Sequence, residues 1–206
     1  MIDKEKMREW ARFLLTYKFA LDEVNTKLNI LNEEFQFIHD YNPIEHVKTR
    51  IKAPESIAAK LKRKNLELSM ASAGLHIRDI AGVRIICSFS TDIYRIHEMI
   101  CRQDDVKVIE VKDYIKNPKP NGYQSLHLIV EIPIFLTSGV ERVMVEIQIR
   151  TSAMDFWASL EHKIYYKFNA SVPETIGREL KETAAIIASL DERMLKLNEE
   201  AKSCRV

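Results

Sequence analysis

Glycine is scarce in this chain of 206 residues, which contains only five glycines, no two of them closer than eight positions. A Walker A loop and a GxGxxG turn both need closely spaced glycines, because their backbone amides must approach phosphate groups. The sequence therefore excludes both motifs. If this protein binds phosphates, lysine, arginine, serine and histidine side chains must hold them.

Cysteine is also rare, and its number is odd. Cys87, Cys101 and Cys204 are widely spaced and form no CxxC pair, which excludes the common zinc and dithiol redox motifs. We expect reduced thiols in a cytoplasmic protein, since disulfides persist mainly in oxidising compartments.

Long apolar runs and an excess of one charge are missing as well. No uncharged apolar stretch approaches the roughly 20 residues of a membrane span, and the first residues lack the apolar region of a secretory signal. We therefore expect no membrane partner. Lysine and arginine number 31 against 30 aspartate and glutamate, for a net charge of +1. A general coat for duplex DNA depends on net positive charge and is disfavoured.

Apolar periodicity predicts helices in the first part of the chain. Residues 4–40 repeat apolar side chains every three or four positions, as in one or two helices with a buried stripe. The sequence Asn-Pro-Ile-Glu at 42–45 has the composition of a helix start. Another helix is expected from Ala-Pro-Glu at 53–55 to about residue 65.

The middle of the chain changes to an alternation of apolar and polar residues. This pattern, rich in β-branched side chains, predicts four strands. They are expected around residues 83–87, 106–115, 126–135 and 143–150. A helix over residues 92–101 is expected between the first two strands.

The last part is helical again. One helix has a shared apolar face at Ala153, Trp157, Leu160, Ile164 and Phe168. The sequence Ser-Val-Pro-Glu at 171–174 predicts a capped start for the final helix. That helix has an apolar stripe at Ile176, Leu180, Ala184, Ile187, Leu190, Met194 and Leu197. We expect an α+β fold with a helical arm over 1–41, a small mixed sheet flanked by helices over 42–168, and a C-terminal helix over 169–206.

A local excess of positive charge lies between residues 48 and 64, with seven basic residues and one acidic residue. In the helix expected there, one stripe of one face carries Ser56, Lys60 and Arg63. Arg50 and Lys52 precede the helix N-terminus, an end that favours anions. The pattern suits a polyphosphate ligand. The alternative is an ordinary solvated basic face.

Two carboxylates stand at unusual places in the expected sheet. Asp79 comes just before a very apolar strand that contains Arg84, and Glu146 alternates with Gln148 on the polar face of the last strand. If the two strands adjoin, both carboxylates could converge on a hard cation such as Mg²⁺. Otherwise Asp79 is a turn residue and the last strand is half exposed.

The segment 114–127 contains two prolines and an Asn-Gly pair, so we expect a loop. Its Tyr123 and His127, with Lys119 nearby, offer a stacking surface beside hydrogen-bond donors for phosphate groups. Nucleotide binding requires both. The alternative is a hairpin connection with ordinary surface residues.

The order of these segments is more specific than any one of them. It comprises RxKxxxSxxxK from Arg50, IRDIAGVRII from Ile77, YIKNPKPNGYQSLH from Tyr114 and VEIQIRTSAMDFWASLEHK from Val145. The series strongly resembles the synthetase domain of RelA/SpoT-type enzymes over residues 42–167. The flanking helices are similar to those of the small alarmone synthetases, and the chain looks closest to their RelP-type branch. The resemblance implies a nucleotidyltransferase-like fold and, by analogy with small members, a homotetramer.

By this resemblance, the protein would be a GTP diphosphokinase that transfers pyrophosphate from ATP to the ribose 3′-hydroxyl of GDP or GTP. The products would be ppGpp or pppGpp, the signals of the stringent response, and AMP. Arg50 and Arg84 would sandwich the adenine. The ATP phosphates would be held by Lys52, Ser56, Lys60 and Arg63. Asp79 and Glu146 would bind Mg²⁺, with Glu146 also the candidate base.

The resemblance also assigns the acceptor nucleotide. Tyr123 would stack on the guanine, while Lys119 and His127 would face the acceptor phosphates. Secondary acceptor contacts are implied for Asn121, Gln148 and Lys112. Lys112 departs from the pattern, because relatives often have arginine there.

Other functions compete with synthesis. An RNA-binding module could use the basic 48–64 stripe and the 114–127 loop, although two acids in the cleft would repel nucleic acid unless a metal intervened. The terminal helical stripes could serve an interaction scaffold. His39-Asp40 resembles the metal pair of alarmone hydrolases, but none of the 38 preceding residues is histidine, so we expect no ppGpp hydrolysis.

Overall fold

Alternating β-branched and polar residues form a five-stranded mixed sheet in the order β1-β2-β5-β4-β3. This computed structural model describes residues 4–167 and 172–204, with side chains over 7–164 and 172–204. β2 and β5 run parallel, and the other neighbouring pairs are antiparallel. The strands are β1 (Ile44–Ile51), β2 (Ala81–Cys87), β3 (Lys107–Asp113), β4 (Leu126–Leu136) and β5 (Gly139–Thr151).

The register of the strands gathers polar side chains on one face. Gly82 of β2 pairs with Glu146 of β5, and Arg84 pairs with Gln148, while β4 places His127 opposite Gln148. Because successive side chains alternate between faces, these residues share one face of the sheet. The other face is apolar and almost completely buried, at Val83, Ile85, Leu128, Val145, Ile147 and Ile149.

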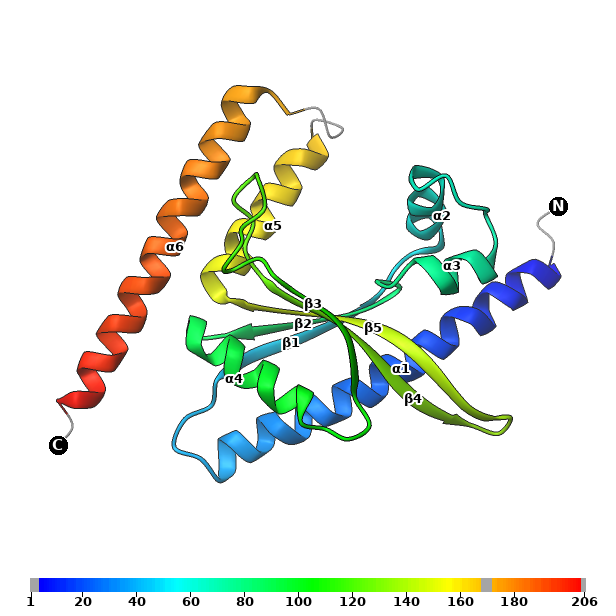
Figure 1. The fold of residues 1–206 in the computed structure, drawn as a ribbon, viewed down its shortest axis with the longest axis horizontal. Helices are drawn as coiled ribbons and strands as arrows, with labels where there is room; N and C mark the ends of the chain where they lie inside the picture. The colour runs from blue at the N-terminus through cyan, green and yellow to red at the C-terminus, as the bar shows by residue number, and fades with distance from the viewer. Residues whose placement is uncertain (1–3, 168–171, 205–206) are drawn as a thin grey trace.

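Two helices cover the apolar face. They are α1 (Lys4–Phe37) and α4 (Ser90–Cys101), so residues 4–37 form one helix rather than two. In Figure 1, α4 lies below the strands while α1 crosses them obliquely. Their apolar stripes join the same core as the strands. The stripes are buried at Leu21, Val24 and Leu28 of α1 and at Ile93, Ile96 and Ile100 of α4.

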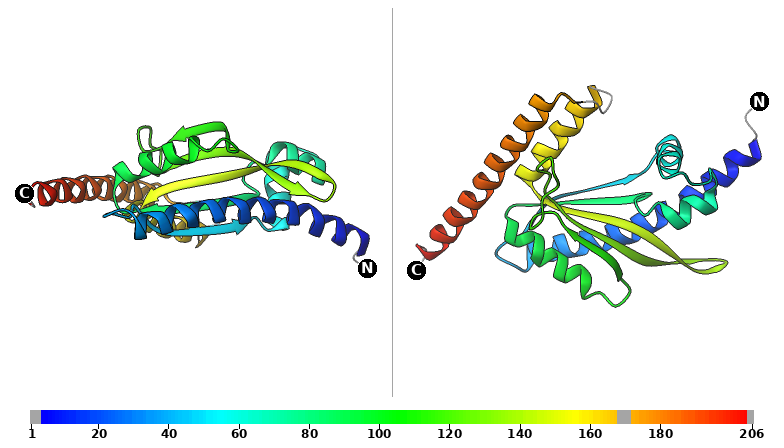
Figure 2. Two further views of the ribbon diagram at one scale, coloured as in Figure 1. Left: turned by 90° about the horizontal axis from the view of Figure 1, so that it is seen from below. Right: turned by 45° about the horizontal axis from the view of Figure 1, so that its top comes forward.

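The remaining helices stand at two ends of the sheet, on its polar side, as Figures 1 and 2 show. One end has α2 (Pro54–Arg63) and the short α3 (Met70–His76), and the other has α5 (Ser152–Lys167) and α6 (Glu174–Ser203). The polar face therefore lies between two helical walls. The α+β class predicted from the sequence is confirmed.

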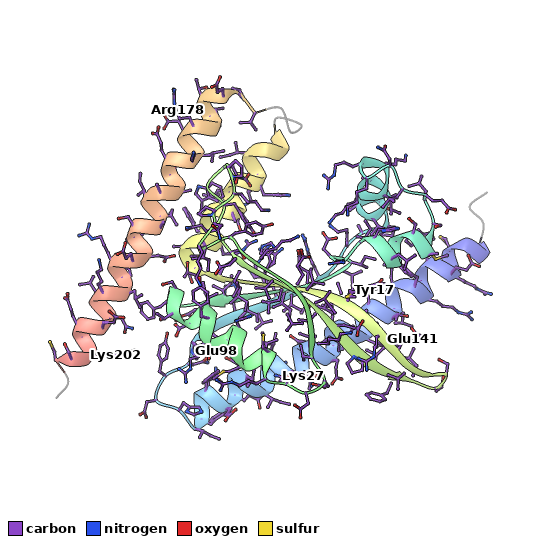
Figure 3. All side chains as sticks on the ribbon, in the orientation of Figure 1. Tyr17, Lys27, Glu98, Glu141, Arg178 and Lys202 are labelled. Carbon is purple, nitrogen blue, oxygen red and sulfur yellow. The ribbon has the colours of Figure 1, made fainter. Side chains whose placement is uncertain are left out.

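Within the described residues, the buried side chains of helix α6 all lie in its first half. Leu180 and Ala184 are buried in a small cluster with Trp157 and Ala158 of α5. Farther along, three stripe residues are 48–57% exposed, namely Leu190, Met194 and Leu197. In Figure 3, Arg178 and Lys202 mark the two ends of this helix, whose later part extends away from the sheet.

The helix start predicted at residues 42–45 is wrong, because that segment leads into β1. The Asn42 side chain does accept a hydrogen bond from a backbone amide, that of Ile44 at 2.9 Å, but this closes a turn before a strand. Val47, Thr49 and Ile51 then alternate with basic residues, and antiparallel pairing with β2 satisfies the backbone. Tertiary pairing overrides the local capping pattern.

Two smaller differences concern helix starts. Helix α3 was not predicted, although Ser69 caps it by accepting a hydrogen bond from the Ser72 amide at 3.1 Å. The N-cap of α6 is Pro173, without a side-chain cap. Ser171, in the predicted capping sequence, and Phe168 lie outside the described residues. No helix within residues 4–167 and 172–204 is long and apolar enough to cross a membrane.

Candidate active site

The polar face of the sheet is hollowed into a cavity of about 400 Å³. Its walls come from β1, α2, the turn before β2, β3, the 114–125 loop, β4, β5 and α5. The structure therefore brings together residues that are far apart in the sequence. Eleven of the cavity's lining residues decide its chemistry: Arg50, Lys60, Asp79, Lys112, Tyr114, Lys119, Asn121, Tyr123, His127, Glu146 and Gln148.

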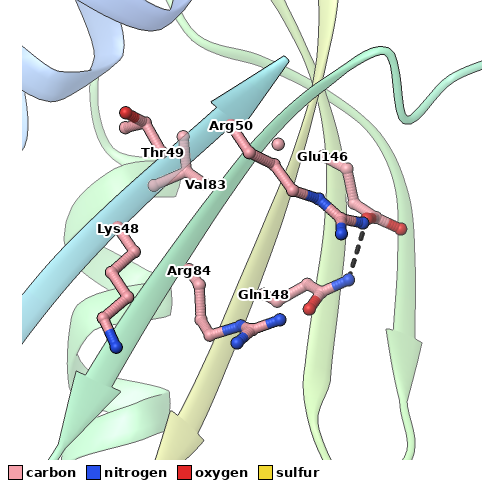
Figure 4. A pocket seen from close by; sticks show the side chains of 8 residues that line it. Lys48, Thr49, Arg50, Val83, Arg84, Glu146 and Gln148 are labelled. Carbon is pink, nitrogen blue, oxygen red and sulfur yellow. Dashed lines mark hydrogen bonds between the residues drawn. The ribbon is translucent and has the colours of Figure 1, made fainter. Parts of the chain in front are cut away.

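An adjoining cavity of about 280 Å³ lies between β1 and β5. Figure 4 shows Arg50 and Arg84 converging on the same space, next to Glu146 and Gln148. Gly82 lines this cavity, and a Cβ there would be in ordinary van der Waals contact with the Arg50 side chain, at 3.6 Å. Two flat guanidinium groups beside an open space can hold a planar ring.

Asp79 lies in the turn just before β2 and is paired with two cations. Its Oδ2 atom is 3.0 Å from Lys52 Nζ and 2.7 Å from Lys60 Nζ. Burial by itself would raise the pKa of Asp79, but the two lysines outweigh it and the pKa falls below its usual value. The other oxygen, Oδ1, is buried without a hydrogen-bond partner. Asp79 is therefore an ionised carboxylate with one free ligand atom.

The remaining members of the predicted phosphate stripe face outward. Ser56 and Arg63 are exposed on α2 and lie outside both cavities described above. Ile57 and Leu61, on the other side of α2, are 0% and 1% exposed and fix the helix to the core. Helix α2 thus packs against the core with one face and exposes Ser56 and Arg63 on another.

Glu146 occupies the floor of the cavity, just past the middle of β5. Its Oε1 atom is 3.6 Å from His127 Nδ1, and its Oε2 accepts a hydrogen bond from Gln148 Nε2 at 2.8 Å. Burial and the nearby Asp79 charge raise the pKa of Glu146, yet His127 and Gln148 together hold it below its usual value. Burial lowers the pKa of His127, which favours a neutral ring. At neutral pH an ionised carboxylate therefore faces a neutral imidazole.

The 114–125 loop forms the opposite wall. Lys119 Nζ lies between two aromatic rings, 4.7 Å from the centre of Tyr114 and 4.6 Å from that of Tyr123. The Tyr123 hydroxyl is 2.8 Å from His127 Nε2, and Asn121 donates to Glu161 of α5 at 2.9 Å. Burial lowers the pKa of Lys119, so its charge is held at a cost that an anionic ligand would relieve.

Lys112 lies at the far side of the cavity, on β3. Its Nζ is 3.2 Å from Glu110 Oε1, and Arg78 Nη1 is 3.2 Å from the other oxygen of the same carboxylate. Glu110 was not predicted as a site residue. Since it neutralises part of this wall, the cationic character there is weaker than the sequence pattern suggested.

Two further residues beside the site, Arg150 and Asp155, were not predicted as site residues from the sequence. Arg150 is only 4% exposed. Asp155 Oδ1 is 3.1 Å from both Arg150 Nη1 and Arg84 Nη1. One signal for Arg150 was visible in the sequence: it continues the alternating polar series of Glu146 and Gln148. Asp155 gives no such signal, because its role depends on how α5 starts against the sheet.

Comparison with known proteins identifies relatives along nearly the whole chain. Residues 49–171 match the model of a region found in RelA and SpoT proteins. The GTP pyrophosphokinase YwaC of Bacillus subtilis is 55% identical over 197 residues, which are 96% of this chain and 94% of that protein.

Solved structures agree. The small alarmone synthetase 1 of B. subtilis bound to its product pppGpp superposes with a TM-score of 0.88 at 38% identity, covering 94% of this chain and 98% of that one. The same synthetase bound to AMPCPP gives a TM-score of 0.83 at 36% identity, covering 95% and 99%.

Proposed function

Since this chain belongs to the RelA/SpoT family, we propose that it is a small alarmone synthetase, a transferase that moves the pyrophosphate of ATP to the ribose 3′-hydroxyl of GDP or GTP. The products are ppGpp or pppGpp and AMP. One observation carries the proposal: a single sheet face joins a cationic wall, two carboxylates and an aromatic-lined loop in adjoining cavities. Two nucleotides that must react need this arrangement, because their phosphates repel each other.

For the donor, we propose that Arg50 and Arg84 enclose the adenine of ATP. The cavity between β1 and β5 supports this, since both guanidinium groups border it. The ATP phosphates then extend toward α2, where the proposed ligands are Lys52, Ser56, Lys60 and Arg63. Lys52 and Lys60 support this, because both pair with Asp79, the proposed Mg²⁺ ligand.

For the metal, Asp79 and Glu146 would hold Mg²⁺. The fit is chemical: Asp79 Oδ1 is buried and unpartnered, and Glu146 borders the same cavity. Within the described part of the chain, no group of three or more histidine, cysteine, aspartate or glutamate residues could hold a metal alone. Mg²⁺ commonly binds one or two carboxylates together with substrate phosphates, so two protein ligands suffice. When bound, it would neutralise phosphate charge.

For the acceptor, Tyr123 would stack on the guanine. Lys119 and His127 would face its phosphates, with Asn121, Gln148 and Lys112 as secondary contacts. We propose that the Lys119 ammonium group, which contacts the Tyr114 and Tyr123 rings, shifts when a base stacks on Tyr123. A phosphate in the cavity then replaces the rings as its partner.

For the chemical step, Glu146 would orient the ribose 3′-hydroxyl and accept its proton. It is suited to this because its lowered pKa keeps it ionised at neutral pH. The same low pKa limits its proton affinity, so its main contribution is to fix the oxygen in line with the transferred phosphorus. Gln148 and His127 hold the carboxylate for that purpose.

The reaction is tested by incubating the protein with ATP, GTP and Mg²⁺ and separating the nucleotides. We expect AMP together with a more phosphorylated guanosine. ADP in place of AMP would overturn the assignment, because it would indicate transfer of a single phosphate. Pre-formed ppGpp with Mn²⁺ should stay intact, since we propose no hydrolase activity.

The competing RNA-binding function predicts a different result. RNA binding that persists in EDTA and is lost in Lys60→Ala would favour it, because such binding needs cations but no metal. The carboxylates on the cavity floor argue against it.

We further propose a cytoplasmic homotetramer of the RelP-type branch, with residues 1–41 as an arm, 42–168 as the synthetase domain and 169–206 as the oligomerisation helix. The exposed apolar residues Leu190, Met194 and Leu197 support this use of α6. Light scattering tests the assembly: a strict monomer at micromolar concentration would refute it.

A further inference from the structure

The cavity wall contains a buried cation that the proposed reaction does not yet use. Arg150 of β5 is 4% exposed, and its guanidinium donates to four different groups. Nε donates to Ser125 Oγ at 3.3 Å and Nη1 to Asp155 Oδ1 at 3.1 Å. Nη2 donates to Gln148 Oε1 at 2.7 Å and to the Tyr123 hydroxyl. Burying a charge is costly unless it is fully paired, so this network has a purpose beyond filling space.

Two of these hydrogen-bond partners, Tyr123 and Gln148, are side chains that are proposed to contact GDP or GTP. The guanidinium carbon also lies 5.0 Å from the centre of the Tyr123 ring, so Arg150 fixes both the hydroxyl and the ring. Through Gln148 the network continues to Glu146, because the Gln148 amide oxygen accepts from Arg150 while its Nε2 donates to Glu146. The amide orientation of Gln148 is thereby determined from both sides.

Arg150 is also connected to the proposed ATP-binding side of the site, but only through Asp155. Asp155 is shared with Arg84, which borders the proposed adenine cavity. Arg84 therefore keeps one carboxylate partner if Arg150 is replaced. A defect at Arg150 should thus appear at the acceptor site first.

We propose that Arg150 is a positioning residue that holds Tyr123 and the Gln148–Glu146 pair in the geometry required by the guanine nucleotide. This rests on the proposed function, because it assumes that Tyr123 and Gln148 contact the acceptor. The planar fork of arginine supplies donors in several fixed directions at once, which a lysine ammonium cannot reproduce with the same geometry.

The first test compares Arg150→Lys with Arg142→Lys. Both residues lie on β5, but the Arg142 side chain is 59% exposed and pairs only with Glu131 within the described residues. We expect Arg150→Lys to raise the KM for GDP and its Kd measured by calorimetry about tenfold or more, as expected for lost charge-assisted hydrogen bonds. The KM for ATP should change less than about twofold. Arg142→Lys should match the wild type.

The second test uses chemical rescue. In Arg150→Ala, added guanidinium chloride at millimolar concentration should restore GDP affinity, whereas sodium chloride at equal ionic strength should not. A purely structural role would not respond to the shape of the added ion at concentrations far below those that unfold proteins.

The third test leaves Arg150 in place and removes one of its four hydrogen-bond partners, a hydroxyl that also contacts His127. Tyr123→Phe keeps the ring but removes the hydroxyl that Arg150 holds, and we expect weaker GDP binding with ATP binding unchanged. Unchanged GDP affinity in Tyr123→Phe or in folded Arg150→Lys would overturn the proposal, as would equal increases in both KM values. If the wild type itself made no AMP, the proposed function would be refuted. The GDP affinities of the wild type and the Arg150 variants would still test the positioning role.

Discussion

A Cβ atom placed on Gly122 would lie 2.5 Å from the Cβ of Ala184, well inside van der Waals contact. Gly122 belongs to the loop that carries Tyr123, and Ala184 is buried on α6. Gly122 also has φ of +90°, a conformation that L side chains rarely adopt. The C-terminal helix thus directly supports the 114–125 loop, and only glycine permits the approach.

Replacing Gly122 by alanine should therefore displace the loop. We expect weaker GDP binding and a higher KM for GDP, with about 1–2 kcal/mol of backbone strain added to the steric conflict. Combining it with Ala184→Gly should remove the steric part but leave the strain. Calorimetric titration with GDP distinguishes the cases: equal affinities in the single and double variants would show that α6 does not restrain the loop.

Glu146→Gln should abolish turnover while nucleotide binding survives. The amide keeps the size of the side chain but can neither accept the hydroxyl proton nor hold a cation by charge. The rate should fall at least about 100-fold. Release of AMP measures turnover and calorimetry measures binding. Full activity would contradict both the base role and the metal role of Glu146.

Lys60 and Lys62 offer a matched pair on α2. Lys60 lies 2.7 Å from Asp79 inside the cavity, whereas Lys62 is exposed. We expect Lys60→Ala to raise the KM for ATP about tenfold or more, because a charge-assisted phosphate contact is lost. Lys62→Ala should leave it nearly unchanged. If both variants behaved alike, general positive charge rather than position would govern ATP binding.

Asp191 of α6 predicts a pH dependence of stability. Partial burial raises its pKa above the usual value, and the hydrogen bond from Thr151 offsets this only in part. The folded state therefore binds the proton more tightly than the unfolded state, which favours folding at pH values below the unfolded pKa. This contribution is lost as the pH rises through the folded pKa.

Asp191→Asn keeps an acceptor for Thr151 and removes the titration. At pH 7 the variant should be at least as stable as the wild type. On acidification toward pH 4 the free energy of unfolding of the wild type should rise relative to that of the variant. Urea unfolding at several pH values checks this, with Glu192→Gln at an exposed neighbouring position as control. A relative loss of wild-type stability on acidification would contradict the sign.

The strands β2 to β5 were predictable because their segments are rich in β-branched residues. The helices α1, α2, α4, α5 and α6 were predictable because apolar residues recur in them every three or four positions. β1 was not, since its alternation begins only at Val47, after an Asn-Pro pair that also suits a helix. α3 was missed because seven residues give too short a pattern. The candidate site followed from the motif order, but Arg150 and Asp155 did not, because their importance depends on mutual contacts.

The order of residues along the chain was enough to establish the family and the α+β class, because motifs and periods are local properties. Pairing between distant segments required the folded structure. β1 joins the sheet because β2 satisfies its backbone, and Asp155 pairs with two arginines because α5 begins beside them. Gly122 is required because α6 passes within contact distance. Such contacts join residues that are far apart in the chain, so no single stretch of sequence predicts them.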